Sequence, residues 1–282
     1  MSSPRVSVVI PVFNGLPYLP ETVASVEAQT HPNVELVLVD GGSSDGSREW
    51  IERYERANLI KEYLPAGTPA AANWTRASEL ATGDYVKLLC QDDLITPSAL
   101  SSQCADLDAH PTAGMAIAQR DVISASGKVL TAGRGCAGLP TGLVNGRRSL
   151  EVAARKGANI FGEPLAVLFR RDALAQALPW DDAEPFLLDM FFYAKVLSTY
   201  DVVVRKEAVG AFRISGSSWS TRLAAKQRQQ FRAWQRHVEA IVPQPWYRIA
   251  EARLNNDKTT AIRRMAYAWL RVRGDLSRPA GG

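Results

Sequence analysis

The first hundred residues alternate short continuous apolar runs with segments in which apolar positions recur every three or four residues. Continuous runs rich in β-branched residues are typical of strands covered on both faces, and the wider spacing is typical of amphipathic helices. The pattern predicts strands at 5–10, 34–40, 59–64 and 85–89, and helices at 19–29, 45–56 and 69–81. This alternation predicts an α/β fold with a mostly parallel, Rossmann-like sheet flanked by helices.

Polar motifs follow three of these predicted strands. They read PVFN at 11–14, VDGGSSDG at 39–46 and CQDD at 90–93. The carboxyl ends of parallel strands lie at one edge of a sheet, and ligands bind beyond that edge. We therefore expect the three motifs to share one binding site.

The chain beyond residue 100 is less regular. Its apolar patterns predict one or two strands at 114–124, a strand leading into a helix at 164–174 and a helix at 185–200. Within 201–220 they predict two strands separated by a turn and followed by a Ser/Gly-rich loop. Residues 131–146 are rich in glycine and predict a long loop, and such loops are often functional.

The tail carries a different charge from the rest of the chain. Residues 222–282 have a net charge of +9 and residues 1–221 a net charge of −5. Helical spacing is followed by Phe231, Trp234, Val238 and Ile241, and again by Ile262, Met265, Trp269 and Val272. Basic amphipathic helices bind anionic membrane surfaces. The alternative is a helix pair that packs on the domain or on a second subunit, as in a homodimer. No recognised nucleic-acid-binding module is present, so we expect no nucleic acid partner.

These observations divide the chain into two predicted parts. Residues 1–221 form one domain, with a regular half at 1–100 and a less regular half at 101–221, and residues 222–282 form a basic helical C-terminal extension.

Composition narrows the protein class. The chain is 46% hydrophobic and 22% charged, which excludes disordered and fibrous proteins. Its apolar runs are too short for a signal peptide or a transmembrane helix. The three cysteines, Cys90, Cys104 and Cys136, are odd in number and widely spaced, which indicates reduced thiols in a cytoplasmic protein.

Acidic residues at two strand ends are candidates for binding chemistry. Asp40 can accept hydrogen bonds from a base or a ribose while the neighbouring glycines let the backbone approach a phosphate. Its alternative role is to cap the next helix. Asp92 and Asp93 offer the oxygen ligands that Mg²⁺ or Mn²⁺ takes together with phosphates. Their alternative is a solvated pair at a helix start.

The order of the motifs is more specific than any one of them. Strand–PVFN–helix, strand–VDGGSSDGS–helix and NWTRASELATGDYVKLLCQDD follow one another at regular spacing. This order resembles the family 2 glycosyltransferases of the GT-A fold. The resemblance is specific over residues 5–100 and weaker over 101–220.

The resemblance implies that 1–100 is a nucleotide-binding half and 101–221 an acceptor-binding half of one glycosyltransferase domain. Pro11, Phe13 and Asn14 would frame the base, Asp40 would bind uracil, thymine or the ribose, and Asn73 matches a helix asparagine near the donor.

It also implies a divalent ion, Mg²⁺ or Mn²⁺, held by Asp92, and a donor sugar held by Asp93 and Gln91. Two residues depart from the family pattern. Gly41, in the nucleotide-binding loop, stands where the family usually has a second aspartate, and Cys90 stands where the metal-binding motif usually begins with aspartate. A thiol is a poor ligand for Mg²⁺, so we expect Asp92 to be the protein ligand of the metal.

An inverting transfer needs a carboxylate that removes the proton of the acceptor hydroxyl. The resemblance assigns this role to Asp189, with Leu188 where the family usually has glutamate. The alternative for Asp189 is a helix N-terminal acid or an arginine partner. Glu163 is either an acceptor contact or an exposed loop acid, and Arg213 is either a structural residue or a phosphate contact.

The resulting hypothesis is an inverting glycosyltransferase. It would move a sugar from a UDP- or dTDP-sugar to a hydroxyl of a glycan or lipid-linked acceptor, in the cytoplasm or at the inner face of the membrane. A nucleotidyltransferase is an alternative, although PVFNGLPYLPE lacks the basic residue that would hold a triphosphate. A non-catalytic nucleotide-binding protein on the same scaffold is another.

Overall fold

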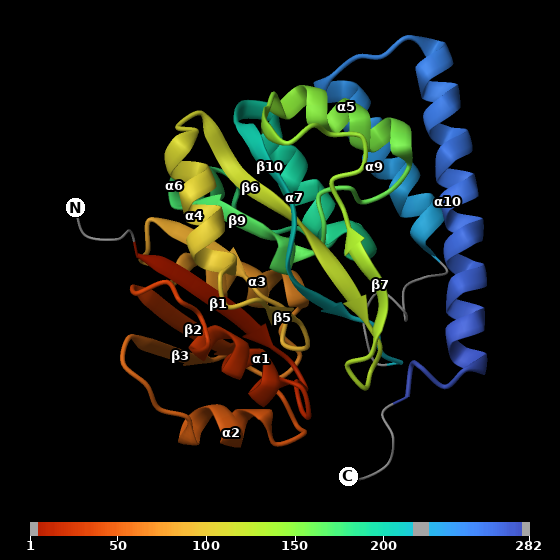
Figure 1. Ribbon diagram of the computed structural model, residues 1–282. Helices are drawn as coiled ribbons and strands as arrows, with labels where there is room; N and C mark the ends of the chain where they lie inside the picture. Colours follow the sequence, from red (N-terminus) through yellow and green to blue (C-terminus); the bar gives the residue numbers. More distant parts are fainter. Residues whose placement is uncertain (1–4, 217–225, 278–282) are drawn as a thin grey trace.

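A mixed sheet forms the centre of the computed structural model, which describes residues 5–216 and 226–277 (Figure 1). In the described residues its strand order is β3-β2-β1-β4-β9-β6-β10-β5, with β7 paired to β6 and β8 to β10. The strands are β1 (Val6–Val12), β2 (Val34–Asp40), β3 (Leu59–Tyr63), β4 (Tyr85–Leu88), β5 (Leu94–Ile95), β6 (Ala113–Ile123), β7 (Val129–Arg134), β8 (Gly142–Val144), β9 (Val167–Arg170) and β10 (Asp201–Arg213).

The first half of the sheet is parallel, as the alternating pattern predicted. Strands β3, β2, β1 and β4 pair in parallel. The helices between them are α1 (Leu19–Glu27), α2 (Ser47–Arg53) and α3 (Ala70–Glu79). Every residue of β1 and β2 is buried, because helices cover both faces of this part of the sheet. The predicted α/β class and GT-A-like architecture are confirmed.

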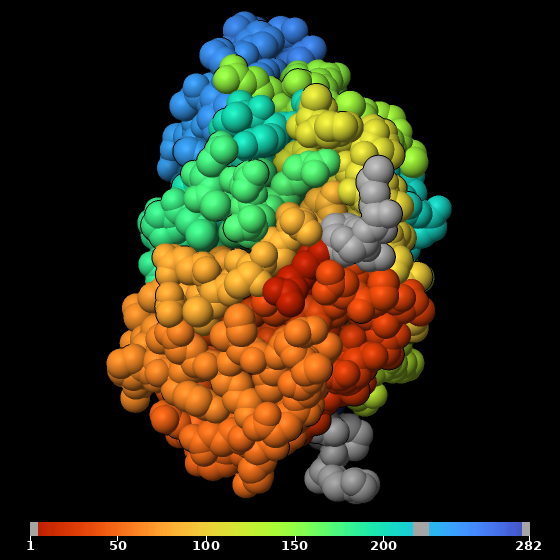
Figure 2. Space-filling model, turned by 90° about the vertical axis from the view of Figure 1, so that its left-hand side faces the viewer, coloured from red at the N-terminus to blue at the C-terminus, as the bar shows by residue number. Residues whose placement is uncertain are grey.

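The second half departs from simple alternation. Strand β9 lies antiparallel between β4 and β6, and β6 and β10 run parallel to each other. The helices here are α4 (Ala99–Ala109), α5 (Gly146–Lys156), α6 (Arg171–Ala177) and α7 (Leu188–Thr199), with 3₁₀ turns at Pro164–Ala166 and Pro185–Leu187. Figure 2 shows the red and orange first half in the lower part of the molecule and the green and blue second half in the upper part.

Two predictions for this half were wrong in detail. The region 201–213 is one long strand, β10, because shifts of register against β6 absorb the irregular positions that suggested a turn. Residues 217–220, which belong to the predicted Ser/Gly-rich loop, lie outside the described residues. The segment 131–146 is not loop throughout, because β7 extends into its start and β8 lies near its end.

The two tail helices, α9 (Gln227–Ile241) and α10 (Trp246–Val272), pack in opposite ways. Of the predicted apolar positions of α9, Phe231, Trp234 and Val238 are buried in the main core, and Ile241 is partly buried against it. Helix α10 extends along one side of the molecule (Figure 1) with its predicted apolar stripe facing outward. The stripe residues Ile262, Met265, Trp269 and Val272 are 54–88% exposed. The predicted boundary between residues 221 and 222 lies outside the described residues.

Among the described residues, no helix is both long enough and apolar enough to span a bilayer.

Candidate active site

The first two motifs are joined directly at the edge of the sheet. Asn14, with φ of 51°, accepts a hydrogen bond from the Ser44 amide at 2.8 Å and donates its own amide to the Ser43 hydroxyl at 2.9 Å. The carboxylate of Asp40 is fully buried and accepts hydrogen bonds from the amides of Gly42 and Ser43. Asp40 therefore shapes its own loop and does not cap α2. Its predicted contact with a nucleotide stays a prediction.

The structure gives a steric reason for the glycine at position 41. A Cβ atom added at Gly41 would lie 2.7 Å from the side-chain nitrogen of Asn73. That nitrogen donates to the carbonyl of Val12 at 3.1 Å, and the Asn73 side-chain oxygen is buried without a hydrogen-bond partner in the described residues. The asparagine thus fills the space that a side chain at position 41 would need.

Gln91 connects the third motif to the first. Its side chain accepts from the Phe13 amide at 2.6 Å and donates to the Phe13 carbonyl at 2.8 Å. This two-point contact fixes the backbone at the end of β1, while the Phe13 ring remains 52% exposed. An exposed aromatic ring on a fixed backbone is suited to stacking against a base.

The paired acids take different environments. Asp93 is fully buried, and one carboxylate oxygen accepts the Arg213 amide at 2.9 Å while the other is buried without a hydrogen-bond partner in the described residues. Burial, followed by the neighbouring charge of Asp92, holds the pKa of Asp93 well above its usual range. Asp92 is partly exposed. The raised pKa favours the protonated form of Asp93, which relieves the repulsion between the two acids.

Arg213 is a buried connector between the halves of the protein. Its guanidinium donates to the Asp92 carbonyl at 2.9 Å and to the Glu21 carboxylate at 2.7 Å, and it lies 4.6 Å from the Tyr18 ring centroid. Of the two predicted roles, these contacts favour the structural one. A phosphate contact stays a prediction.

The acids fit a divalent ion shared with a ligand and do not fit a protein-only metal site. The described residues contain no cluster of three His, Cys, Asp or Glu side chains suited to a metal. Burial, then the charges of Asp93 and Asp92, raise the pKa of the Cys90 thiol well above its usual value, so Cys90 supplies no thiolate. Mg²⁺ and ions of similar size are commonly held by one or two carboxylates plus substrate phosphates. Asp92, which is partly exposed, provides the carboxylate of that donor set.

Asp189 lies in the first turn of α7 and is partly exposed. One of its oxygens accepts the Asn159 side-chain amide at 3.1 Å and the other its neighbour's amide, that of Met190, at 2.7 Å. Desolvation by the surrounding protein, then the charge of Glu163, raise the pKa of Asp189 to about 7. A carboxyl group with this pKa can accept a proton near neutral pH.

Glu163 is not an exposed loop acid, because its side chain is 22% exposed and forms an ion pair with Arg120. Burial alone would raise the pKa of Glu163, but the charge of Arg120 and its hydrogen bond outweigh that effect and keep the pKa below its usual value. Glu163 therefore stays ionised while Asp189 titrates near neutrality.

The tertiary structure brings these acids together around one thiol. The charges of Asp92, Asp93, Asp189 and Glu163 all contribute to the raised pKa of Cys90. Tyr193, one helical turn after Asp189, has a buried hydroxyl without a hydrogen-bond partner in the described residues. Sequence reasoning missed Tyr193, although its spacing from Asp189 places it on the same face of α7. It also missed Asn159 and Arg120, which no local pattern marks.

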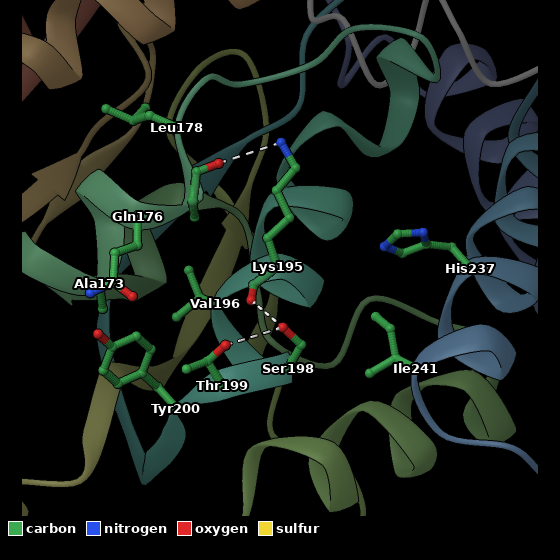
Figure 3. Close-up of a pocket in the computed structure, with 11 residues that line it drawn as sticks. Ala173, Gln176, Leu178, Lys195, Val196, Ser198, Thr199, Tyr200, His237 and Ile241 are labelled. Carbon is green, nitrogen blue, oxygen red and sulfur yellow. Dashed lines mark hydrogen bonds between the residues drawn. The ribbon is translucent and has the colours of Figure 1, made fainter.

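A separate cavity lies between α6, α7 and α9 (Figure 3). Its volume is about 520 Å³, and Lys195 at its wall donates to the carbonyl of Pro179 at 2.9 Å. None of the described residues that line it is Asp or Glu. It therefore offers no carboxylate for a metal ion, and none of the three polar motifs lines it.

Comparison with known sequences identifies similar proteins. The family model described as "Glycosyl transferase family 2" matches residues 7–177. A putative teichuronic acid biosynthesis glycosyltransferase of Bacillus subtilis is 37% identical over 102 residues, which cover 36% of this chain and 40% of that protein. An uncharacterized glycosyltransferase of Haemophilus influenzae is 35% identical over 107 residues, which cover 36% of this chain and 42% of that protein. These matches span less than half of each relative.

Solved structures share the fold. The structure of S. aureus TarS 1-349 in complex with UDP-GlcNAc has a TM-score of 0.63 and 17% sequence identity, and the match covers 89% of this chain and 70% of that one. The mannosyltransferase PcManGT from Pyrobaculum calidifontis in complex with GDP-Man and Mn²⁺ has a TM-score of 0.59 and 20% identity, and the match covers 96% of this chain and 81% of that one.

The family match extends over more than half of the chain, and its residues are those that build the parallel sheet and the acidic edge. The chain belongs to glycosyl transferase family 2.

Proposed function

We propose that this protein is an inverting glycosyltransferase that uses a nucleotide-diphospho-sugar, with UDP or dTDP as the nucleotide. The observation that carries the proposal is the convergence of Asp92, Asp93 and Asp189 around Cys90, because it joins a metal and diphosphate edge to a general base. TarS in complex with UDP-GlcNAc and PcManGT in complex with GDP-Man share the fold of this chain, which supports this class of donor.

The transfer is a single displacement at the anomeric carbon. Asp189 accepts the proton of the acceptor hydroxyl as the oxygen forms its bond to the sugar, and the bond to the nucleoside diphosphate breaks. Asn159 orients the carboxylate for this step. Phe13 and the loop of Asp40 hold the nucleotide, and Gln91 and Asp93 face the donor sugar. Mg²⁺ or Mn²⁺ at Asp92 would offset the charge that develops on the diphosphate.

The acceptor that we propose is a cell-surface glycan or a lipid-linked precursor of one. The name of the B. subtilis relative, which refers to teichuronic acid biosynthesis, supports a surface polymer. The exposed stripe of α10 supports an acceptor at a membrane, because Met265, Trp269 and Val272 project from a helix that also exposes Lys258 and Arg271. Such a helix would lie on the anionic inner face of the cytoplasmic membrane.

Calorimetric titration tests the donor site. UDP, dTDP and GDP are added to the protein with Mn²⁺ and again with EDTA. We expect one nucleotide to bind with Mn²⁺ and to lose affinity in EDTA. If none of them binds under either condition, the transferase proposal is wrong.

Co-sedimentation with vesicles tests the membrane contact. We expect binding to phosphatidylcholine vesicles that contain phosphatidylglycerol, and a loss of binding when Met265 and Trp269 are both replaced by serine. The stripe is instead a subunit interface if the protein does not bind the vesicles and light scattering finds a dimer that dissociates when Met265 and Trp269 are replaced by serine.

A further inference from the structure

Arg263 lies on the inward face of α10, next to the candidate active site. The buried residues of this helix include Thr260 and Tyr267, which are three and four residues away from Arg263, so the three share one face. The Arg263 guanidinium lies 5.7 Å from the centroid of the Phe186 ring, and Phe186 precedes Asp189 by three residues. The side chain is partly buried. The C-terminal helix therefore contributes a cation beside the predicted base.

Arg134 supplies a second cation from β7. It is the register partner of Arg120 in the antiparallel pairing of β6 with β7. Directly opposed residues of an antiparallel pair project from the same face of the sheet, and like charges in such a pair are unfavourable. Arg120 is neutralised by its ion pair with Glu163, whereas Arg134 is exposed and forms no ion pair in the described residues.

Arg134 and Arg120 lie close enough to Arg263 to affect its pKa. Burial lowers the pKa of Arg263; Tyr267 and Glu163 oppose that effect, and Arg134 and Arg120 reinforce it. Three positive charges thus face one ionised carboxylate, Glu163, and a second, Asp189, that is only partly ionised at neutral pH.

Neither Arg134 nor Arg263 has a carboxylate partner in the described part of the chain, residues 5–216 and 226–277. The sequences outside those ranges contain no Asp or Glu. Arginine prefers planar anions such as carboxylate and phosphate, which it binds through two parallel hydrogen bonds.

We propose that Arg134 and Arg263 form a subsite for an anionic group of the acceptor, a carboxylate or a phosphate, next to the hydroxyl that Asp189 deprotonates. The inference rests on the proposed function. The nucleotide motifs lie at the ends of β1, β2 and β4, whereas β7 and α10 lie at the other side of the sheet, beyond β6 (Figure 1). The position of the two arginines therefore favours the acceptor over the diphosphate of the donor.

Binding of matched small probes tests the subsite. Glucose, glucuronate and glucose 6-phosphate are titrated into the full chain by saturation-transfer NMR, with and without UDP and Mn²⁺. We expect at least one charged probe to bind about tenfold more tightly than glucose. The two charged probes distinguish a carboxylate from a phosphate. Loss of the preference when UDP is present would assign the arginines to the donor and overturn the proposal.

Arg263→Gln should remove most of this preference and leave UDP affinity unchanged. Arg264→Gln is the matched control, because Arg264 is the next residue of the same helix and is exposed. Equal affinity for charged and neutral probes, no binding of either charged probe, or a preference that survives Arg263→Gln and Arg134→Gln would overturn the subsite. Thermal unfolding of each variant separates a lost site from a lost fold. If UDP fails to bind while the anion preference is present, the proposed function fails and the subsite stands.

Discussion

The side-chain amide of Asn159 donates a hydrogen bond of 3.1 Å to the carboxylate of Asp189. The Asn159 oxygen accepts the backbone amides of Phe161 and Gly162 at 3.1 and 3.0 Å. An asparagine side chain has one oxygen and one NH₂ group, so these two bonds fix which end faces Asp189. The loop before β9 thus stabilises the ionised form of the predicted base.

Replacing Asp189 by asparagine should remove turnover without removing the nucleotide site. We expect kcat to fall by about 10²–10⁴-fold, the usual contribution of a general base, with UDP affinity unchanged. Steady-state kinetics and calorimetry measure the two quantities. A variant that retains turnover would show that Asp189 is not the base, and absence of turnover in the unmodified protein with every donor tested would favour a non-catalytic binding protein.

The pH dependence of the reaction should report the raised pKa of Asp189. The base acts in its deprotonated form, so kcat/KM should rise with pH through about 7 and level off above it. Asn159→Ala removes a hydrogen-bond donor to the carboxylate of Asp189, which raises the pKa of that group. The rise of kcat/KM should therefore move to higher pH. A pH profile of kcat/KM that does not move after this change would contradict the role of Asn159.

Asp189 should also affect the stability of the folded protein, which should fall as pH rises while the activity increases. A carboxyl whose pKa is higher in the folded than in the unfolded protein costs stability as pH rises from about 4 to about 7. Asp189→Asn is neutral at all pH values. We expect its Tm to exceed that of the unmodified protein at pH 8, with little difference at pH 4, as measured by thermal unfolding. An equal difference at both pH values would contradict this linkage.

Asp92→Asn should weaken nucleotide binding in Mn²⁺ by about tenfold or more and leave binding in EDTA unchanged. The change removes the partly exposed carboxylate that would bind the proposed ion. Cys90→Ser is the control. Its thiol is neutral, so metal-dependent binding should survive the change. Binding that is equal for Asp92→Asn and the unmodified protein in Mn²⁺ would remove Asp92 from the metal site.

Gly41→Asp, which introduces the usual family residue, should destabilise this protein by about 1–3 kcal/mol, because the new Cβ overlaps Asn73. Adding Asn73→Ala should recover part of the loss, since neighbouring substitutions are coupled. Denaturant unfolding of the single and double variants measures the loss of stability and its partial recovery. Strictly additive losses would mean that Asn73 does not exclude a side chain at position 41.

The sequence predicted the parallel half of the fold and the composition of its edge. Continuous apolar strands, helical spacing and the order of three polar motifs are local patterns. They can therefore be recognised without knowing which other segments of the chain they pack against. The same information led to the family. It did not predict the antiparallel insertion of β9, which brings Glu163 toward the edge, because β9 pairs with strands that lie far from it in the chain.

The packing of the chain decided which face of a helix is buried, which the apolar periodicity alone did not predict. Helix α10 follows an apolar spacing like that of α9, yet it buries the opposite face, because Asn256 and Thr260 meet the domain while Trp269 stays exposed. Lys87, within a strand that was predicted to be buried, is fully buried because its ammonium group donates to the carbonyls of Leu165 and Val167.

The chemistry of the site follows the same division. The sequence by itself determined which acids are present and placed Asp92 and Asp93 at a strand end. Only the tertiary structure decided that one is buried and the other partly exposed, that Asn159 holds Asp189, and that Arg134 and Arg263 approach from β7 and α10. The physical reason is that protonation state and charge balance depend on desolvation and on neighbours contributed by distant segments.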